Sequence, residues 1–173
     1  MSDHATEVNQ NLKSKILSLL FEGRIMSVAT IRLDGWPQVT TVGYMNTDLV
    51  LYFAAASTSQ KFLNIQRDPR ISIAIAFPPT GARQGHGLSM AARASQVLEL
   101  DEIDRVNDAL AGRYFGRTVF APRGPSAVIL RADAMIISLV DDSDGMSEPQ
   151  IFHVPKSGEM DPPEPHGGPA WEH

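Results

Sequence analysis

The sequence predicts one mainly antiparallel β domain with flanking helices. Six segments are rich in β-branched and apolar residues, and turn-forming residues separate most of them, which is typical of strands in an antiparallel sheet. Three other stretches show helical spacing of apolar residues or begin with helix-capping residues. The chain has 173 residues, of which 43% are hydrophobic and 20% charged, and this composition supports a single globular domain with a buried core.

The first predicted element is an amphipathic helix from Val8 to Glu22. Its apolar residues recur at three- and four-residue spacing, with polar residues between them. These apolar positions are Leu12, Ile16, Leu19 and Leu20. Gly23 follows directly and is typical of a residue that ends a helix, so we expect the helix to stop at Glu22.

The next three elements are predicted to be strands of a meander. Segments Ile25–Leu33 and Pro37–Met45 are rich in β-branched residues and are joined at Asp34-Gly35, which is a strong hairpin pattern. They should therefore pair as antiparallel strands. A polar break at Asn46–Asp48 leads into Leu49–Ala55, whose apolar run is too short for a core helix and predicts a buried strand.

A short helix should follow this third strand. Residues Ser57–Ser59 are good helix-capping residues, and they precede a segment that begins at Lys61. Pro69 cannot continue a helix, so we expect the helix to end before it.

The remaining elements are two strands, a helix and a last strand. Arg70–Phe77 alternates isoleucines with smaller residues, and a Gly-rich loop at Pro78–Gly87, expected to be mobile, leads to a strand at Leu88–Leu100. Asp101 begins a helix and Ser126–Val140 is the last strand. The apolar face of that helix consists of Ile103, Val106 and Leu110. The chain is thus expected to contain six strands and three helices.

Composition excludes several classes of function. The net charge of -5 argues against a protein whose main partner is nucleic acid. The chain has no cysteine, so disulfides, thiolate metal sites and thiol nucleophiles are excluded. No apolar run approaches the roughly 20 residues of a membrane-spanning helix. The N-terminus is polar and acidic and lacks the pattern of a secretory signal, so we expect a cytoplasmic protein.

The start of the short helix is a candidate anion site. Ser57, Thr58, Ser59, Gln60 and Lys61 bring hydroxyl groups, free backbone N–H groups and one ammonium to the positive end of a helix. In the alternative interpretation, Ser57 or Ser59 is an ordinary N-cap and Lys61 a solvated lysine of the first turn. The local sequence alone favours this alternative.

The order of motifs around this helix start points to a known family. A strand, the turn Asp34-Gly35-Trp36-Pro37, two strands, Ser59-Gln60-Lys61 and Asp68-Pro69-Arg70-Ile71 follow one another before the next strand. This order resembles the FMN-binding split barrel of the pyridoxamine 5'-phosphate oxidase-like superfamily, whose members carry D-G-x-P, S-x-K and N-P-R-[VI] at similar spacing. The resemblance implies a six-stranded antiparallel split barrel with flanking helices over residues 1–140. Residues 141–173 would then be an acidic, Pro/Gly-rich tail, extended or disordered unless a second subunit orders it.

The resemblance also implies a cofactor site. In the family, FMN lies in a groove between two subunits, so the chain is expected to form a homodimer with the cofactor at the subunit interface. The phosphate would be held by the S-x-K segment, the ribityl chain and ring would run beside the second strand, and two alanines before the helix would approach through their backbone. The implied residues are Thr40, Thr41, Val42, Ala54, Ala55, Ser59, Gln60 and Lys61.

Three positions depart from the oxidase itself, which carries arginine, lysine and arginine where this chain has Thr40, Met45 and Gln60. Together with the acidic tail, this makes oxidation of pyridoxamine phosphate unexpected. The resemblance instead implies an FMN-dependent oxidoreductase with a small-molecule substrate. The alternatives are a non-catalytic protein that carries, stores or senses flavin or haem, and a reductase that uses the deazaflavin F420.

Other candidate groups are weaker. Arg113 and Arg117, with Arg123, would bind a second anion, but arginines at a helix end commonly bind the carbonyl groups of their own helix. His86 would act as a proton donor over a flavin, although a histidine between glycines in a loop is usually solvated. The other histidines are too scattered to predict a metal site, and no G-x-S-x-G motif is present. No metal and no catalytic side chain are assigned.

Overall fold

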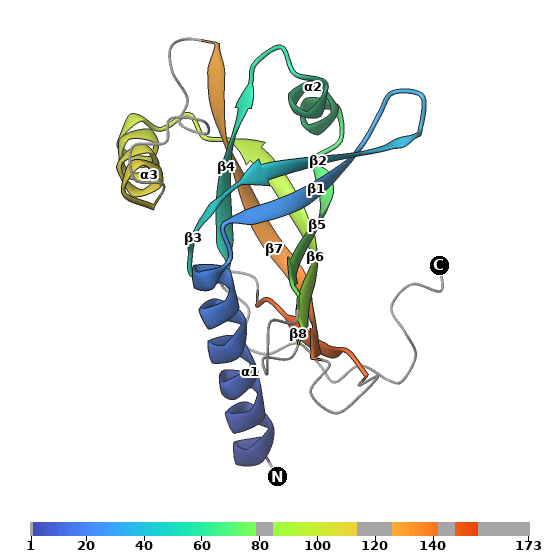
Figure 1. The fold of residues 1–173 in the computed structure, drawn as a ribbon, viewed down its shortest axis with the longest axis vertical. Coiled ribbons are helices and arrows are strands. Elements are labelled where there is room, and N and C mark those ends of the chain that lie inside the picture. The colour runs from blue at the N-terminus through green and yellow to red at the C-terminus, as the bar shows by residue number, and fades with distance from the viewer. Residues whose placement is uncertain (1, 79–84, 114–125, 142–147, 156–173) are drawn as a thin grey trace.

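The computed structural model describes residues 2–78, 85–113, 126–141 and 148–155, which form one curled antiparallel sheet with three flanking helices (Figure 1). The helices are α1 (Ser2–Glu22), α2 (Gln60–Arg67) and α3 (Leu100–Arg113). The strands are β1 (Ile25–Ile31), β2 (Pro37–Gly43), β3 (Met45–Thr47), β4 (Val50–Ala56), β5 (Arg70–Phe77), β6 (His86–Gln96), β7 (Ala127–Asp141) and β8 (Gln150–His153). The sheet curls into a half-barrel, which confirms the predicted mainly β, split-barrel class.

The long strand β7 makes the sheet bend. The strand order is β2-β1-β5-β6-β7-β4-β3, and β8 pairs with β7 beside this path. One end of β7 pairs with β4 and the other end with β8. Every residue of β6 pairs with β7. The register of β6 and β7 shifts between Ala91 and Ala92, which leaves Met135 as an extra residue on β7. Such a bulge increases local twist and bending of the strand.

The chain crosses between the two ends of this strand order at Tyr44. Strands β2 and β3 are consecutive in the chain but stand at opposite ends of the path, with only Tyr44 between them. The Tyr44 N–H donates to the carbonyl oxygen of Arg24 at 3.2 Å, and its buried hydroxyl donates to that of Leu20 at 2.9 Å. This short connection holds the two sheet edges near each other.

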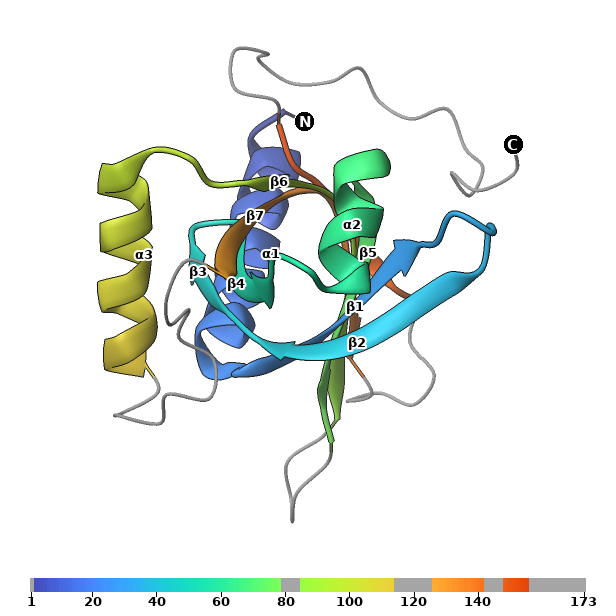
Figure 2. The same cartoon turned by 90° about the horizontal axis from the view of Figure 1, so that it is seen from above.

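The main core fills the half-barrel. Helices α2 and α1 lie at its opposite ends in Figure 1, and in the view from above both lie near the middle of the curled strands (Figure 2). Helix α1 contacts β3 and β8, and α2 contacts β1, β4 and β6. The predicted apolar face of α1 is buried as expected, and this helix ends at Glu22 before Gly23, although it begins earlier than predicted, at Ser2. The largest fully buried side chains are Tyr44, Phe53, Ile16, Leu20, Met26, Leu51, Ile73, Leu88, Leu130, Ile137, Leu139 and Val28.

A second, smaller core lies beneath α3. Val106 and Leu110 are buried there and Ile103 packs against them, which confirms the predicted apolar face of this helix. The Tyr52 hydroxyl of β4 donates to Glu102 of α3 at 2.7 Å. This bond anchors the start of α3 to the sheet.

The number and bounds of the strands differ from the prediction. The structure contains eight strands in the described ranges, two more than predicted. The additional strands are Met45–Thr47 and Gln150–His153, and each of them pairs over only a few residues. The predicted break at Asn46–Asp48 was too long, since the turn is confined to Asp48 and Leu49. Asp48 has a φ of 51°, which aspartate tolerates better than most residues, and the Asn46 side chain supports the turn by donating to the Asp48 carbonyl oxygen at 3.0 Å.

The bounds of β6 also differ from the prediction. It runs from His86 to Gln96 rather than from Leu88 to Leu100, because His86 continues the ladder by pairing with Phe77. Leu100 instead begins α3, whose first turn contains Asp101 and Glu102. Acidic side chains are favourable near the positive end of a helix.

Part of the predicted tail joins the sheet. The prediction left this tail without order unless a second subunit supplied it, but Gln150–His153 forms a strand that pairs with β7 of the same chain. Phe152 is buried in the main core. The remainder of the tail, residues 142–147 and 156–173, and most of the loop expected to be mobile, residues 79–84, lie outside the described residues.

The contact between Gly23 and Tyr44 yields a testable prediction. A Cβ atom at residue 23 would collide with the Tyr44 hydroxyl and approach Phe77 and Ile75 within 3.2 and 3.3 Å. We therefore expect Gly23→Ala to lower the free energy of unfolding by about 1 to 3 kcal/mol, measured by urea denaturation. Gly112→Ala is the control, because a Cβ there meets nothing within 4 Å and alanine favours a helix. If both substitutions changed the free energy of unfolding equally, the chain would not be tightly packed where Gly23 meets Tyr44.

Candidate functional site

Helix α2 begins with a side-chain cap. Strand β4 leads into a short turn in which the Ser57 N–H donates to the Ser126 carbonyl oxygen at 2.7 Å. Ser59 is the N-cap, and its hydroxyl oxygen accepts from the backbone N–H of Phe62 at 3.3 Å. The capping interpretation of Ser59 is therefore confirmed. The N–H groups of Gln60 and Lys61, in the first turn, have no acceptor within the helix and remain available to an anion.

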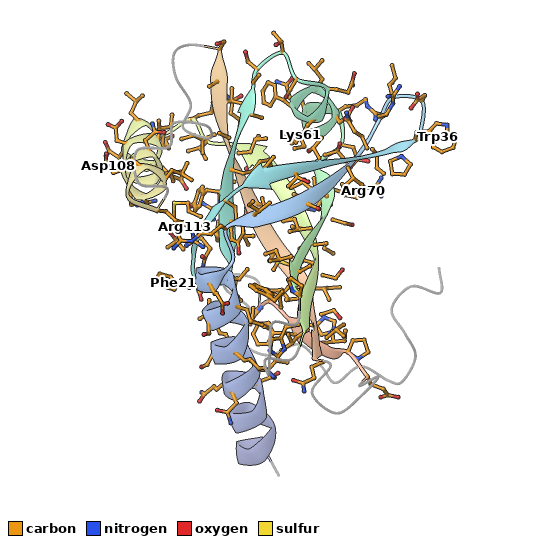
Figure 3. All side chains as sticks on the ribbon, in the orientation of Figure 1. Phe21, Trp36, Lys61, Arg70, Asp108 and Arg113 are labelled. Atoms are coloured by element: carbon orange, nitrogen blue, oxygen red, sulfur yellow. The ribbon has the colours of Figure 1, made fainter. Side chains whose placement is uncertain are left out.

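Lys61 lies half-buried at this helix start (Figure 3). Its Nζ atom is 5.9 Å from the centre of the Phe53 ring, a cation–π contact with a fully buried side chain. Burial lowers the pKa of the Lys61 ammonium. Among the described residues, no acidic side chain forms a salt bridge with it. Lys61 is thus a partly desolvated cation without a charged partner in the described part of the chain.

Gln60 belongs to a hydrogen-bonded group that the sequence did not predict. Its Nε2 donates to Oδ1 of Asn64 at 2.9 Å, one turn further along α2. The Asn64 Nδ2 donates to Thr30 Oγ1 at 3.0 Å and to Gln38 Oε1 at 3.2 Å. The only sequence pattern that pointed to it was a polar asparagine close to the apolar residues Phe62 and Ile65, which are buried in this short helix. We call Gln60, Asn64, Thr30 and Gln38 the amide network.

The predicted residues of β2 lie on two faces of the sheet. Val42 packs in the main core, so Thr40, two residues away, lies on the same inner face, and Thr41 lies on the opposite, exposed face. The Thr40 hydroxyl oxygen is buried and has no hydrogen-bond partner among the described residues. Buried hydroxyl groups are normally paired, so a ligand group or a water molecule that reached this atom would satisfy it.

The two predicted alanines of β4 are divided in the same way. Ala55 packs in the main core, whereas Ala54 shares the face of Tyr52, which belongs to the second core under α3. Met45, where the oxidase carries lysine, is also buried in that second core. Among the predicted residues, the inner face therefore carries the side chains of Thr40, Val42 and Ala55, but not those of Thr41 and Ala54.

A pocket of about 370 Å³ lies between the β1–β2 hairpin and the start of α2, and Arg32, Leu33, Asp34 and Gln60 line it. Arg32 donates to both carboxylate oxygens of Asp34, at 3.1 and 2.9 Å, so the two charges compensate each other. Asp34 also accepts from the Trp36 N–H at 3.2 Å, and Gly35 has a φ of 85°. These contacts explain the D-G-x-P motif as a turn. Of the predicted cofactor-binding residues, only Gln60 lines the pocket.

The Asp68-Pro69-Arg70 motif fixes the other end of α2. Asp68 accepts from the Arg70 N–H at 3.1 Å and from its guanidinium at 2.7 Å. These contacts lower the pKa of Asp68 from 3.8 to about 2. Arg67 adds a bond to the Ile31 carbonyl oxygen of β1 at 2.6 Å. The motif therefore orients the helix and its following strand.

Arg113 binds carbonyl oxygens of a different helix from its own. Its guanidinium donates to the carbonyl oxygens of Leu20 and Phe21, at 3.0 and 2.9 Å, and to that of Gly23. It also lies over the rings of Phe21 and Tyr44, at 5.7 and 5.4 Å from their centres. Arg113 thus caps α1. Arg117 and Arg123 lie outside the described residues.

Within the described ranges, no group of three histidine, cysteine or acidic side chains could hold a metal ion. No helix in those ranges is long and apolar enough to cross a membrane.

Comparison with known families gives one match that covers most of the chain. The family model of pyridoxamine 5'-phosphate oxidase matches residues 12–141. No curated protein matches the chain by sequence. Among solved structures, a conserved hypothetical protein from Mycobacterium tuberculosis is similar, with 26% identity and a TM-score of 0.65 over 75% of this chain and 84% of the other.

Three further solved structures share the fold and are described by a ligand. An FAD-binding protein from Mesorhizobium loti has 20% identity and a TM-score of 0.60 over 71% of this chain and 89% of its own. An F420 reductase has 24% identity and a TM-score of 0.57, with 70% and 94% covered. The haem storage protein HutZ from Vibrio cholerae has 15% identity and a TM-score of 0.60, with 81% and 92% covered.

The lowered pKa of Asp68 predicts an acid-sensitive contribution to stability. Because the folded pKa of about 2 lies below the ordinary 3.8, the ionised carboxylate stabilises the fold above about pH 4, and this contribution is lost as pH falls toward 2. We expect Asp68→Asn to be less stable than the parent at pH 7, with the difference shrinking toward pH 2 in urea denaturation. Asp108→Asn on α3 controls for the loss of one surface charge. A difference that is constant with pH would contradict the assignment.

Proposed function

The chain belongs to the pyridoxamine 5'-phosphate oxidase family, and from this premise we propose that it is an FMN-dependent oxidoreductase acting on a small-molecule substrate. The observation that carries the proposal is Lys61. Lys61 is a half-buried ammonium at a helix start, with no acidic partner among the described residues. A phosphate group would stabilise its charge better than water does.

The residues at the start of α2 fit a phosphate monoester. Lys61 supplies the charge, and the N–H groups of Gln60 and Lys61 supply backbone donors. Thr40 offers a buried hydroxyl group that no other described residue satisfies. The backbone of β2 at Thr41 and of β4 at Ala54 and Ala55 would lie along the ribityl chain and ring, as the family resemblance implies. Their small or exposed side chains leave room for this approach.

In this proposal the bound FMN supplies hydride or electron transfer, and the chain supplies binding and orientation. Among the described residues, Lys61 is the one cation at this helix start, which distinguishes the site from one built around several arginines and lysines. Gln60 is neutral and Met45 is buried elsewhere, so neither adds charge. We therefore do not propose oxidation of pyridoxamine phosphate, and we assign no side chain as an acid or base.

We further propose that two copies of the chain pair through one exposed face of the sheet, with the cofactor at their interface. Two rows of side chains cross strands β2, β1, β5 and β6 in register on this face. The rows are Thr41, Ser27, Ala74 and Ser89, and Val39, Ala29, Ser72 and Ala91. We call these residues the outer face. Val39 is 63% exposed, and the other side chains are small, so a flat partner surface can approach closely.

The same geometry supports a second candidate, a non-catalytic protein that carries or stores flavin or haem. Its support is the haem storage protein with the same fold and the low charge of the site. A reductase that uses F420 is the third candidate, supported by the F420 reductase of similar fold. The absorption spectrum of the purified protein separates these cases, because flavin, haem and deazaflavin absorb at different wavelengths.

The proposal predicts a phosphate-specific role for Lys61. A charge-assisted contact is worth roughly 1.5 to 3 kcal/mol, so Lys61→Ala should weaken FMN binding by about tenfold to a hundredfold, with riboflavin binding almost unchanged. Calorimetric titration of both ligands measures this contrast. Lys13→Ala is the control, since Lys13 lies on α1 in an exposed pair with Asp48. Equal FMN affinity in Lys61→Ala and the parent would sink the proposal for this residue.

The outer face predicts the effect of a charge at its centre. Ala74 is exposed and lies between Ser27 and Ser89, so Ala74→Arg should place an unpaired charge in the proposed interface. We expect a dimeric parent and a largely monomeric variant in sedimentation velocity at micromolar concentration. Ser18→Arg on the exposed side of α1 adds the same charge elsewhere and should remain dimeric. A monomeric parent, or a dimeric Ala74→Arg, would show that the outer face is not the interface.

A further inference from the structure

Asn64 forms the centre of the amide network and is 1% exposed. Its Nδ2 uses both hydrogens, toward Thr30 of β1 and Gln38 of β2, and its Oδ1 accepts from Gln60 of α2. An amide that is satisfied at both ends in a buried place holds a single orientation, because any rotation leaves polar groups unpaired. The amide network therefore fixes α2 on the β1–β2 pair.

The point at which Asn64 attaches α2 to β1 and β2 lies next to a residue of the candidate site. Thr30 pairs with Gln38 across the two strands, and the adjacent inward-facing pair is Val28 with Thr40. Residues two apart on a strand are separated by roughly 6.6 Å. Asn64 therefore attaches α2 one row away from the buried Thr40 hydroxyl, which has no partner within the described ranges.

The same attachment sets the direction of Lys61. Lys61 and Asn64 are three residues apart in one helix, so their side chains lie on neighbouring parts of its surface. A second tie, from Arg67 to the Ile31 carbonyl oxygen, holds the far end of the helix to β1 at 2.6 Å. With both ties in place, α2 cannot turn about its axis, and Lys61 keeps its position over Phe53.

We propose that Asn64 is a positioning residue of the phosphate site, a proposal that rests on the proposed function. Its amide holds the start of α2 beside β2, so that Lys61 and the Thr40 hydroxyl meet the same phosphate group. Asn64 does not touch the ligand. Removing its amide should weaken phosphate recognition while leaving the flavin ring and ribityl contacts intact.

The test compares FMN with riboflavin by calorimetric titration. Asn64→Leu keeps the size of the side chain and removes the amide, and we expect FMN affinity to fall about tenfold with riboflavin affinity unchanged. Thr30→Val removes one hydrogen bond with little change of shape, so it should show a smaller loss of the same kind if Asn64→Leu folds poorly. Asn46→Ala removes an amide of β3 that is not in the network and should leave both affinities unchanged.

A double substitution separates positioning from stability. If Asn64 acts mainly by positioning Lys61, Asn64→Leu should lower the FMN-to-riboflavin affinity ratio much less in the Lys61→Ala protein than in the parent. Equal weakening of FMN and riboflavin, or a lowered melting temperature with an unchanged ratio, overturns the positioning role but leaves the proposed function standing. A parent protein that does not prefer FMN to riboflavin overturns both.

Discussion

The crossing of the chain at Tyr44 is the constraint on which the architecture depends. The strand order begins with β2 and ends with β3, yet one residue joins them, so the sheet has to curl until its two edges meet. Tyr44 is fully buried at this point, and its hydroxyl bonds the last turn of α1. Arg113, from the end of α3, lies over the Tyr44 ring and binds carbonyl oxygens of the same turn. The ends of two helices and two sheet edges are therefore joined at one place.

The curl divides the strands into an inner and an outer face with different side chains. Inward positions of β5 are the isoleucines Ile71, Ile73 and Ile75, all buried, and the outward positions between them are serine or alanine. Burial of large apolar groups on one face stabilises the half-barrel. The small groups opposite add little to that core and leave a flat surface. The simple alternation of β5 thus serves both the fold and the proposed pairing of two copies.

Elements formed by residues close in the chain were predicted from the sequence, and elements that depend on distant residues were not. The face of α1, the hairpin at Gly35 and the cap at Ser59 depend on residues close in the chain, and these predictions were confirmed. Strands β3 and β8 were missed because three or four residues show no measurable periodicity, and only their partners define them. Likewise, Asn64 bonds Thr30, 34 residues earlier in the chain, and Arg113 bonds Leu20, 93 residues away. No local pattern could have given these pairs.

The start of α2 is formed both by interactions between residues close in the chain and by interactions between residues far apart in it. Its cap at Ser59 is local and would be the same in any helix, so the cap alone is no evidence for a ligand. The distinguishing features are non-local: Lys61 rests against Phe53 of β4, and the amide network holds the helix to β1 and β2. Desolvation favours loss of the lysine proton, which is why its pKa is lowered, and a bound phosphate would have the opposite effect. The fold therefore holds a cation in a place where water stabilises it poorly, and a phosphate group there would offset that cost.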